Sequence, residues 1–394
     1  MLPRLRRHLS YPHRMAPSSG RRAPTAEEID ARKIIGINEE TVTNTVSDEY
    51  PENFANEEHA WDKEDFRRGF RVQWHQNDQF EAQFSLIGID ASIANAFRRI
   101  LIAEIPTLAV ESVFVMNNTS VIQDEVLAHR LGLIPFTGSK EGIRDFLGFW
   151  RKPEPGEETY VNTFDNNTIQ LNLNATCTHN KDAAKDAYKP EDLYHGSSVY
   201  ARDLVFVPLG DQEKYFTGPE NTIRPVNPDI LIAKLRPGQV LDIEMHMHKG
   251  FGYDHAKYSP VATASYRLLP TIKILSPILG DDARKFQNCF MPGVIELEKV
   301  TRKEASTQGS GYEGSEGEVK AVVKDPMRDT VSREVLRHPE FEGKVKLGRR
   351  KDHFIFSIES TGQWDSDELF MESVKTLKKK CQVLRPQVTG MVYT

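Results

Sequence analysis

The sequence is poor in the residues and runs that mark several common classes of protein. It has only three cysteines in 394 residues, Cys177, Cys289 and Cys381, about a hundred residues apart. Cysteines so widely spaced predict neither a disulfide framework nor a four-cysteine metal site. No apolar run approaches the ~20 residues that span a bilayer, so we expect a soluble protein with no membrane segment.

An excess of basic residues is also missing from most of the chain. Lys and Arg number 51 against 57 Asp and Glu, a net charge of −6. The first 24 residues hold six arginines and no acid, which leaves −12 for the other residues. Proteins that bind nucleic acid through their own surface need a basic stripe to contact phosphates. We therefore expect no direct sequence-specific binding of nucleic acid.

The arginine-rich segment, residues 1–33, has no apolar periodicity that predicts a core element. Its composition is that of an organelle transit peptide. The simpler interpretations are a disordered tail, or a true start at Met15. We expect a disordered tail here.

Residues 91–106 predict a helix with apolar side chains on two sides. At 100° per residue, Ile102 lies beside Asn95 and opposite the main apolar stripe. Pro106 ends the helix because the residue before a proline avoids helical angles. The run from 108 to 115 is rich in β-branched residues and predicts a strand. The main stripe consists of Ile93, Ala96, Phe97, Ile100 and Leu101.

Arg98 and Arg99 flank that stripe. Most arginine pairs on amphipathic helices are simply solvated. Because apolar residues occupy both sides of this helix, we expect one or both arginines to bind carboxylates or carbonyls across an interface.

The carboxyl-terminal region predicts a strand at 353–359 and then a second amphipathic helix. Acidic residues begin this helix and lysines end it, as the helix dipole favours, and Pro386 should stop it. Its apolar residues fall at spacings of 4, 3, 4 and 3, a narrow seam that packs on another helix. The seam either closes its own domain or binds a partner. Its members are Phe370, Val374, Leu377, Cys381 and Leu384.

Short alternating strands fill the middle of the chain, at 169–175, 199–207 and 240–248. Long apolar strands return after residue 260, notably at 266–275. A Gly, Ser and Glu-rich stretch at about 303–319 cannot bury apolar area and is expected to be a disordered loop. The pattern predicts an α+β fold.

Histidines at 246, 248 and 255, with Asp254, offer an alternative function. Two histidines two apart on a strand share a face, so His246, His248 and His255 could form the metal site of a metal-dependent hydrolase. However, Asp242 and Glu244 occupy the same face, which is the ordinary pattern of a half-exposed strand. We expect no metal, no cofactor and no catalytic residue.

Six stretches give the chain a family resemblance. The segment NAFRRILIAEIPTLAVESV at 95–113 resembles the helix-and-strand signature of the alpha-like subunits of cellular RNA polymerases. Five more stretches match the branch of larger alpha-like subunits shared by eukaryotic polymerases I and III. They lie at 118–135, 199–204, 231–239, 254–270 and 329–337.

The resemblance implies a split dimerisation domain of antiparallel sheet and helices, interrupted by an inserted β-rich domain. The implied boundaries are 34–112 and 262–394 for the dimerisation domain and 113–261 for the insertion. Some polymerase II and archaeal members carry a cysteine cluster for zinc or iron-sulfur in the insertion. Cys177 stands alone in this chain, which favours the branch of polymerases I and III.

The resemblance also implies a role and partners. The chain would be a non-catalytic assembly subunit that forms a heterodimer with the smaller alpha-like subunit, on which two large catalytic subunits and small zinc-bearing subunits dock. It would act in the nucleus, in nucleolus and nucleoplasm, in synthesis of rRNA, 5S rRNA and tRNA. A free-standing scaffold outside transcription is the other alternative. The expected interface residues are Asn95, Phe97, Arg98, Arg99, Ile102, Phe370, Val374, Leu377 and Cys381.

Overall fold

The computed structural model describes residues 25–45, 62–152, 163–184 and 188–392. These residues form two compact units. Unit 1 contains the described residues 25–45, 62–70, 88–91 and 268–353, and unit 2 contains 71–87, 92–152, 163–184, 188–267 and 354–392. Two long strands, β15 (Val261–Ile274) and β18 (Val345–Ser360), have residues in both units. Among the described residues, no helix is long and apolar enough to cross a membrane.

Unit 1 surrounds an apolar core that includes Phe286, Phe341 and Val294. In its sheet, β1 pairs antiparallel with β18, with Gly36 opposite Gly348, and β2 pairs with β1. A separate hairpin joins β16 to β17. The remaining elements are α1 (Ala26–Arg32), β1 (Ile34–Ile37), β2 (Val42–Thr43), α2 (Lys63–Gly69), α7 (Gly280–Asn288), β16 (Ile295–Lys299), α8 (Arg302–Ser306) and β17 (Val319–Val323), with three short 3-10 turns at Pro326–Arg328, Glu334–Arg337 and Pro339–Phe341.

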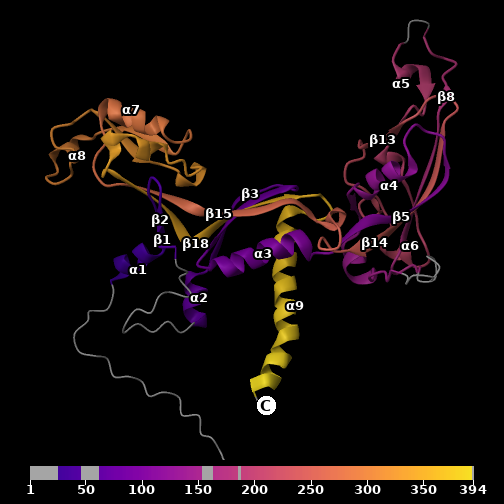
Figure 1. Cartoon of the computed structure of the whole chain (residues 1–394), viewed down its shortest axis with the longest axis horizontal. Coiled ribbons are helices and arrows are strands. Elements are labelled where there is room, and N and C mark those ends of the chain that lie inside the picture. Colours follow the sequence, from indigo (N-terminus) through magenta and orange to yellow (C-terminus); the bar gives the residue numbers. More distant parts are fainter. Residues whose placement is uncertain (1–24, 46–61, 153–162, 185–187, 393–394) are drawn as a thin grey trace, which may run out of the picture. The chain divides into compact units, whose positions relative to one another are not determined.

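Unit 2 contains the sheet and helices that carry the expected interface. Strand β3 (Arg71–Asn77) pairs with β4 (Glu81–Ile87), and β4 lies next to β18. Alternate residues of β4 face the core: Ala82, Phe84 and Leu86 are all buried. Two long helices, α3 (Ala91–Ala103) and α9 (Ser366–Val392), cross one another beside these strands (Figure 1).

A second sheet in unit 2 has the order β11-β7-β14-β5. Its alternating residues build a dry face from Leu171, Leu173, Ile243 and Met245, which are almost fully buried. The elements of this region are β5 (Thr107–Asn118), α4 (Asp124–Gly132), β6 (Phe136–Thr137), the π-helix η1 (Gly142–Phe146), β7 (Ile169–Thr176), β8 (Thr178–His179), α5 (Pro190–Leu193), β9 (Tyr194–His195), β10 (Ser198–Tyr200), η2 (Ala201–Asp203), β11 (Val205–Val207), α6 (Gln212–Tyr215), β12 (Arg224–Pro225), β13 (Leu231–Lys234), β14 (Val240–Gly250) and η3 (Ala256–Tyr258).

The predicted α+β fold is confirmed, with antiparallel pairing throughout the strand ladders whose register is given. The predicted stop at Pro386 is wrong, because α9 continues to Val392 with Pro386 inside it. The side chains of residues 381–388 are all exposed, so among the described residues no close packing opposes the bend that an internal proline introduces.

Most of the predicted tail lies outside the described residues, and its last part forms α1, which begins with a capping box of Thr25 and Glu28. Within the stretch at 303–319, α8 begins with a second capping box, of Thr301 and Glu304. Disorder at both places and the three domain boundaries stay predictions.

A candidate dimerisation surface on two crossing helices

Helix α3 packs one face into unit 2. Ala94, Phe97, Ile100 and Leu101 are buried, whereas Asn95 and Ile102 on the other side are partly exposed. These buried residues recur at spacings of three and four, as expected for one face of a helix with 3.6 residues per turn. The two-sided apolar pattern therefore leaves one side of α3 incompletely covered within this chain.

The first turns of α9 close the same core. Phe370 is only 6% exposed, and its ring lies 4.6 Å from that of Phe84 and 5.5 Å from that of Phe97. Offset and edge-on contacts between aromatic rings are favourable beyond the area they bury. Two of the expected interface residues, Phe97 and Phe370, thus contact each other inside their own unit.

Beyond Phe370 the apolar seam of α9 is open to solvent. Val374 is 36% exposed and Leu384 55%, and Leu377 is half-buried. Val388, four residues beyond Leu384, extends the seam by one turn in the structure and is 57% exposed. Cys381, in the same seam, is exposed. Large apolar side chains in a row on one helix, exposed together, are typical of an interaction surface. The sequence left open whether the seam closes its own domain or binds a partner. The structure buries its first member, Phe370, in the core, and partner binding by the exposed members stays a prediction.

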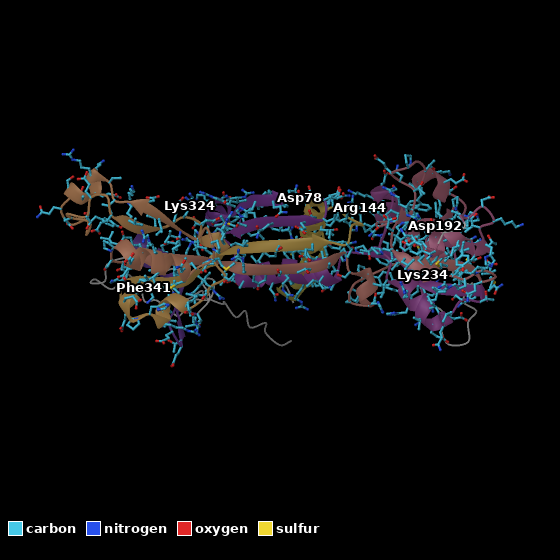
Figure 2. The ribbon with its side chains drawn as sticks, turned by 90° about the horizontal axis from the view of Figure 1, so that it is seen from above. Asp78, Arg144, Asp192, Lys234, Lys324 and Phe341 are labelled. Atoms are coloured by element: carbon cyan, nitrogen blue, oxygen red, sulfur yellow. The ribbon has the colours of Figure 1, made fainter. Side chains whose placement is uncertain are left out.

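The start of α9 is fixed by hydrogen bonds and ion pairs. The Ser366 hydroxyl donates to the backbone oxygen of Asp78, at 2.5 Å, and Arg144 contacts Glu372 at 2.6 Å; Asp78 and Arg144 are both labelled in Figure 2. Lys140 Nζ lies 2.6 Å from Asp365 and 2.7 Å from Glu368.

Burial alone would lower the pKa of Lys140, but hydrogen bonds and charge from the two carboxylates outweigh it and raise that pKa. Sequence reasoning missed these contacts, because Lys140 and Asp365 are 225 residues apart and nothing in the sequence marks them as a pair.

The carboxyl end of α3 also has close contacts in unit 2. Lys380 of α9 binds Glu104 at 2.5 Å, and the Tyr253 amide donates to the Ala103 oxygen at 3.3 Å. A Cβ on Gly252 would lie 2.3 Å from the Ile102 oxygen, so only glycine fits there. These contacts hold the crossing of α3 and α9 in place.

The arginines of α3 differ from each other. Arg98 Nε and Nη2 donate to the Asn95 side-chain oxygen, at 3.0 and 2.9 Å, within the helix. Arg99 is exposed and makes no hydrogen bond or ion pair with any residue that the structure describes. The prediction that they bind across an interface is not tested by this single chain.

The histidines of β14 are held by separate protein partners. His246 Nε2 lies 3.0 Å from Glu244, and the His248 ring stacks 4.3 Å from Trp150, with its Nδ1 3.1 Å from the Asn167 oxygen. Burial lowers the pKa of His248 to about 4. The face was expected to be half-exposed, but His246 and His248 are 5% and 3% exposed, because the Trp150 ring stacks on His248 and the Phe114 ring lies 4.9 Å from that of His246.

No group of three or more metal-binding side chains comes together in the part of the chain that the structure describes. His255 caps η3 and accepts from the Lys257 amide at 3.1 Å. A cleft of about 470 Å³ near Ile102 and Gly252 has Lys257 as its one titratable lining residue among those described. Lys257 already binds Glu111 at 2.5 Å. The cleft therefore offers no acid-base pair for catalysis.

An α+β chain with an exposed apolar seam on a long helix has a surface typical of subunits that assemble with a partner. Comparison with known proteins agrees. The family model of the RNA polymerase Rpb3/Rpb11 dimerisation domain matches residues 83–381.

Among curated relatives, the Saccharomyces cerevisiae protein named DNA-directed RNA polymerases I and III subunit RPAC1 is 48% identical over 352 residues, 89% of this chain and 97% of its own length. The human protein of that name is 46% identical over 356 residues, 90% of this chain and 94% of its own length. The Dictyostelium discoideum DNA-directed RNA polymerase II subunit rpb3 is 29% identical over 317 residues, 78% of this chain and 92% of its own length.

The chain belongs to the family of RNA polymerase subunits built on the Rpb3/Rpb11 dimerisation domain. The predicted resemblance is confirmed, and so is the prediction of a non-catalytic, heterodimerising polymerase subunit. Nothing among the relatives supports the alternative of a metal-dependent hydrolase.

Proposed function

We propose that this chain is the larger alpha-like assembly subunit of DNA-directed RNA polymerases I and III. It acts in the nucleus, in nucleolus and nucleoplasm, where these enzymes make rRNA, 5S rRNA and tRNA. The higher identity to relatives named for polymerases I and III than to the polymerase II relative supports this branch.

The proposed partner in the heterodimer is the smaller alpha-like subunit. The observation that carries this proposal is the exposed seam of α9, Val374, Leu384 and Val388, which continues from the buried Phe370. Covering Val374 and Leu384 would stabilise the complex by about 1–2 kcal/mol each, from apolar area alone. Each step of ~1.4 kcal/mol is a tenfold change in affinity.

We test the heterodimer by expressing the full chain together with a tagged smaller alpha-like subunit. Val374→Asp with Leu384→Asp should lower recovery of the chain at least tenfold. Gln382→Asp places one such charge at another exposed position of the same helix and should leave recovery unchanged, whereas Val374→Asp alone, with the same single charge, should lower it. Equal recovery of the seam variant and the control would remove the seam from the interface.

The two large catalytic subunits and the small zinc-bearing subunits are proposed to dock on this heterodimer. The exposed guanidinium of Arg99, and that of Arg98 once it leaves Asn95, would bind their carboxylates or backbone oxygens. Arg98→Ala with Arg99→Ala should weaken co-purification of the largest subunits and spare the smaller alpha-like partner. Unchanged co-purification of the largest subunits would exclude this role.

A further inference from the structure

Strand β3 is an open sheet edge in unit 2. It is the last strand in the sheet order among the described residues, and all seven of its residues, Arg71–Asn77, are exposed. Figure 2 labels Asp78, which follows the strand in the turn to β4. The outer side of such a strand presents alternate N–H and C=O groups with no partner in the sheet.

The apolar face of the sheet continues out to this edge. Val72 lies opposite Leu86 and Trp74 opposite Phe84, on the face that carries the core. The Trp74 ring is 4.8 Å from Phe84 and 6.5 Å from Phe370. Nevertheless Val72 is 39% exposed and Trp74 42%. The core built by β4 and α9 is therefore uncovered along β3.

The edge has few of the features that keep sheet edges from pairing. It contains no proline and no lysine, and Arg71 is its only charged residue. A bulge between Trp74 and Gln76 interrupts the regular ladder, which leaves Arg71 to Trp74 as the straight part. Arg71 is exposed and has no hydrogen bond or ion pair within the described residues.

We infer that an extended segment of another polymerase subunit adds to this edge as a strand over residues 71–74. Backbone groups of the segment would pair with the open edge, and its apolar side chains would cover Val72 and Trp74. A carboxylate in the segment would bind Arg71. This inference rests on the proposed function. It adds a second contact, made through backbone groups of β3, to the proposed interface on α3 and α9. The two surfaces adjoin where the Trp74 ring contacts that of Phe370.

The test uses the tagged full chain purified from its native source with its associated subunits. Val72→Lys places a charge on the apolar face of the edge, whereas Gln73→Lys places it on the other face of the same strand. The first variant should lose one subunit at least tenfold and keep the smaller alpha-like partner. The control should keep every subunit.

Hydrogen exchange of the unaltered chain gives a second measurement that needs no variant. Amides in 71–77 should exchange at least tenfold more slowly in the complete polymerase than in the heterodimer of alpha-like subunits. Equal exchange in the two, or a Val72→Lys polymerase with every subunit present, would overturn the inference. So would a dimer of this chain by itself that Val72→Lys abolishes, since the occupant would then be a second copy. If the unaltered chain recovers no polymerase subunits, it is the proposed function that fails.

Discussion

Replacing Phe370 or Val374 by alanine tests whether the start of the α9 seam packs in the core of unit 2 and the exposed part binds the partner. Phe370 is 6% exposed and its ring contacts those of Phe84 and Phe97. Removing a buried phenylalanine leaves a cavity and costs about 3–5 kcal/mol. Val374 is 36% exposed, so Val374→Ala should cost the isolated chain about 0.5 kcal/mol or less, as surface changes do.

The assay is urea unfolding of each purified variant, followed by its binding to the smaller alpha-like subunit. Phe370→Ala should lower the free energy of unfolding by about 4 kcal/mol. Val374→Ala should leave that free energy nearly unchanged and weaken binding about fivefold to tenfold. If Phe370→Ala costs less than about 1 kcal/mol and yet abolishes binding, then Phe370 is an anchor for the partner and the assignment to the core is wrong.

Three further outcomes are expected. Cys177 and Cys289 are buried, and burial raises the pKa of both thiols. The exposed Cys381 should therefore be the cysteine that reacts quickly with a thiol reagent. Binding of the smaller alpha-like subunit to the seam should slow that reaction at least fivefold. The pKa of His248 is about 4 against an ordinary 6.5, so the unfolded chain binds the proton first as pH falls. Stability present above pH 6.5 should therefore fall by about 3 kcal/mol by pH 4. Denaturant titrations should show this loss, and His248→Gln should remove most of the dependence of stability on pH. Gly252→Ala should lower the free energy of unfolding by about 2 kcal/mol in the same titrations, because the new Cβ would lie 2.3 Å from the Ile102 oxygen. Gly69→Ala is the control, because a Cβ at Gly69 would have no neighbouring atom within 4 Å and should be tolerated.

Local patterns in the sequence predicted the elements that carry the interface. The β-branched run at 108–115 predicted β5, and the stripe at Phe97, Ile100 and Leu101 predicted the buried face of α3. Such periodicities are properties of one segment, so no knowledge of the fold is needed to recognise them.

Contacts between distant segments were not predictable in this way. The crossing of α3 and α9 depends on the contact between the rings of Phe97 and Phe370. The position of the start of α9 depends on the ion pair between Lys140 and Asp365. The burial of His246 and His248 was missed because it depends on aromatic rings from other segments, those of Phe114 and Trp150. The stop at Pro386 was wrong because proline disfavours a helix interior without excluding it.

The central claim is that this chain pairs with a smaller alpha-like subunit and assembles polymerases I and III. The most direct measurement is purification through a tag on the chain in its native source, with every recovered subunit identified and counted. We expect to recover the subunit sets of both polymerase I and polymerase III, with one smaller alpha-like subunit for each copy of this chain. Recovery of a polymerase II set alone, or of the chain without any large subunit, would contradict it.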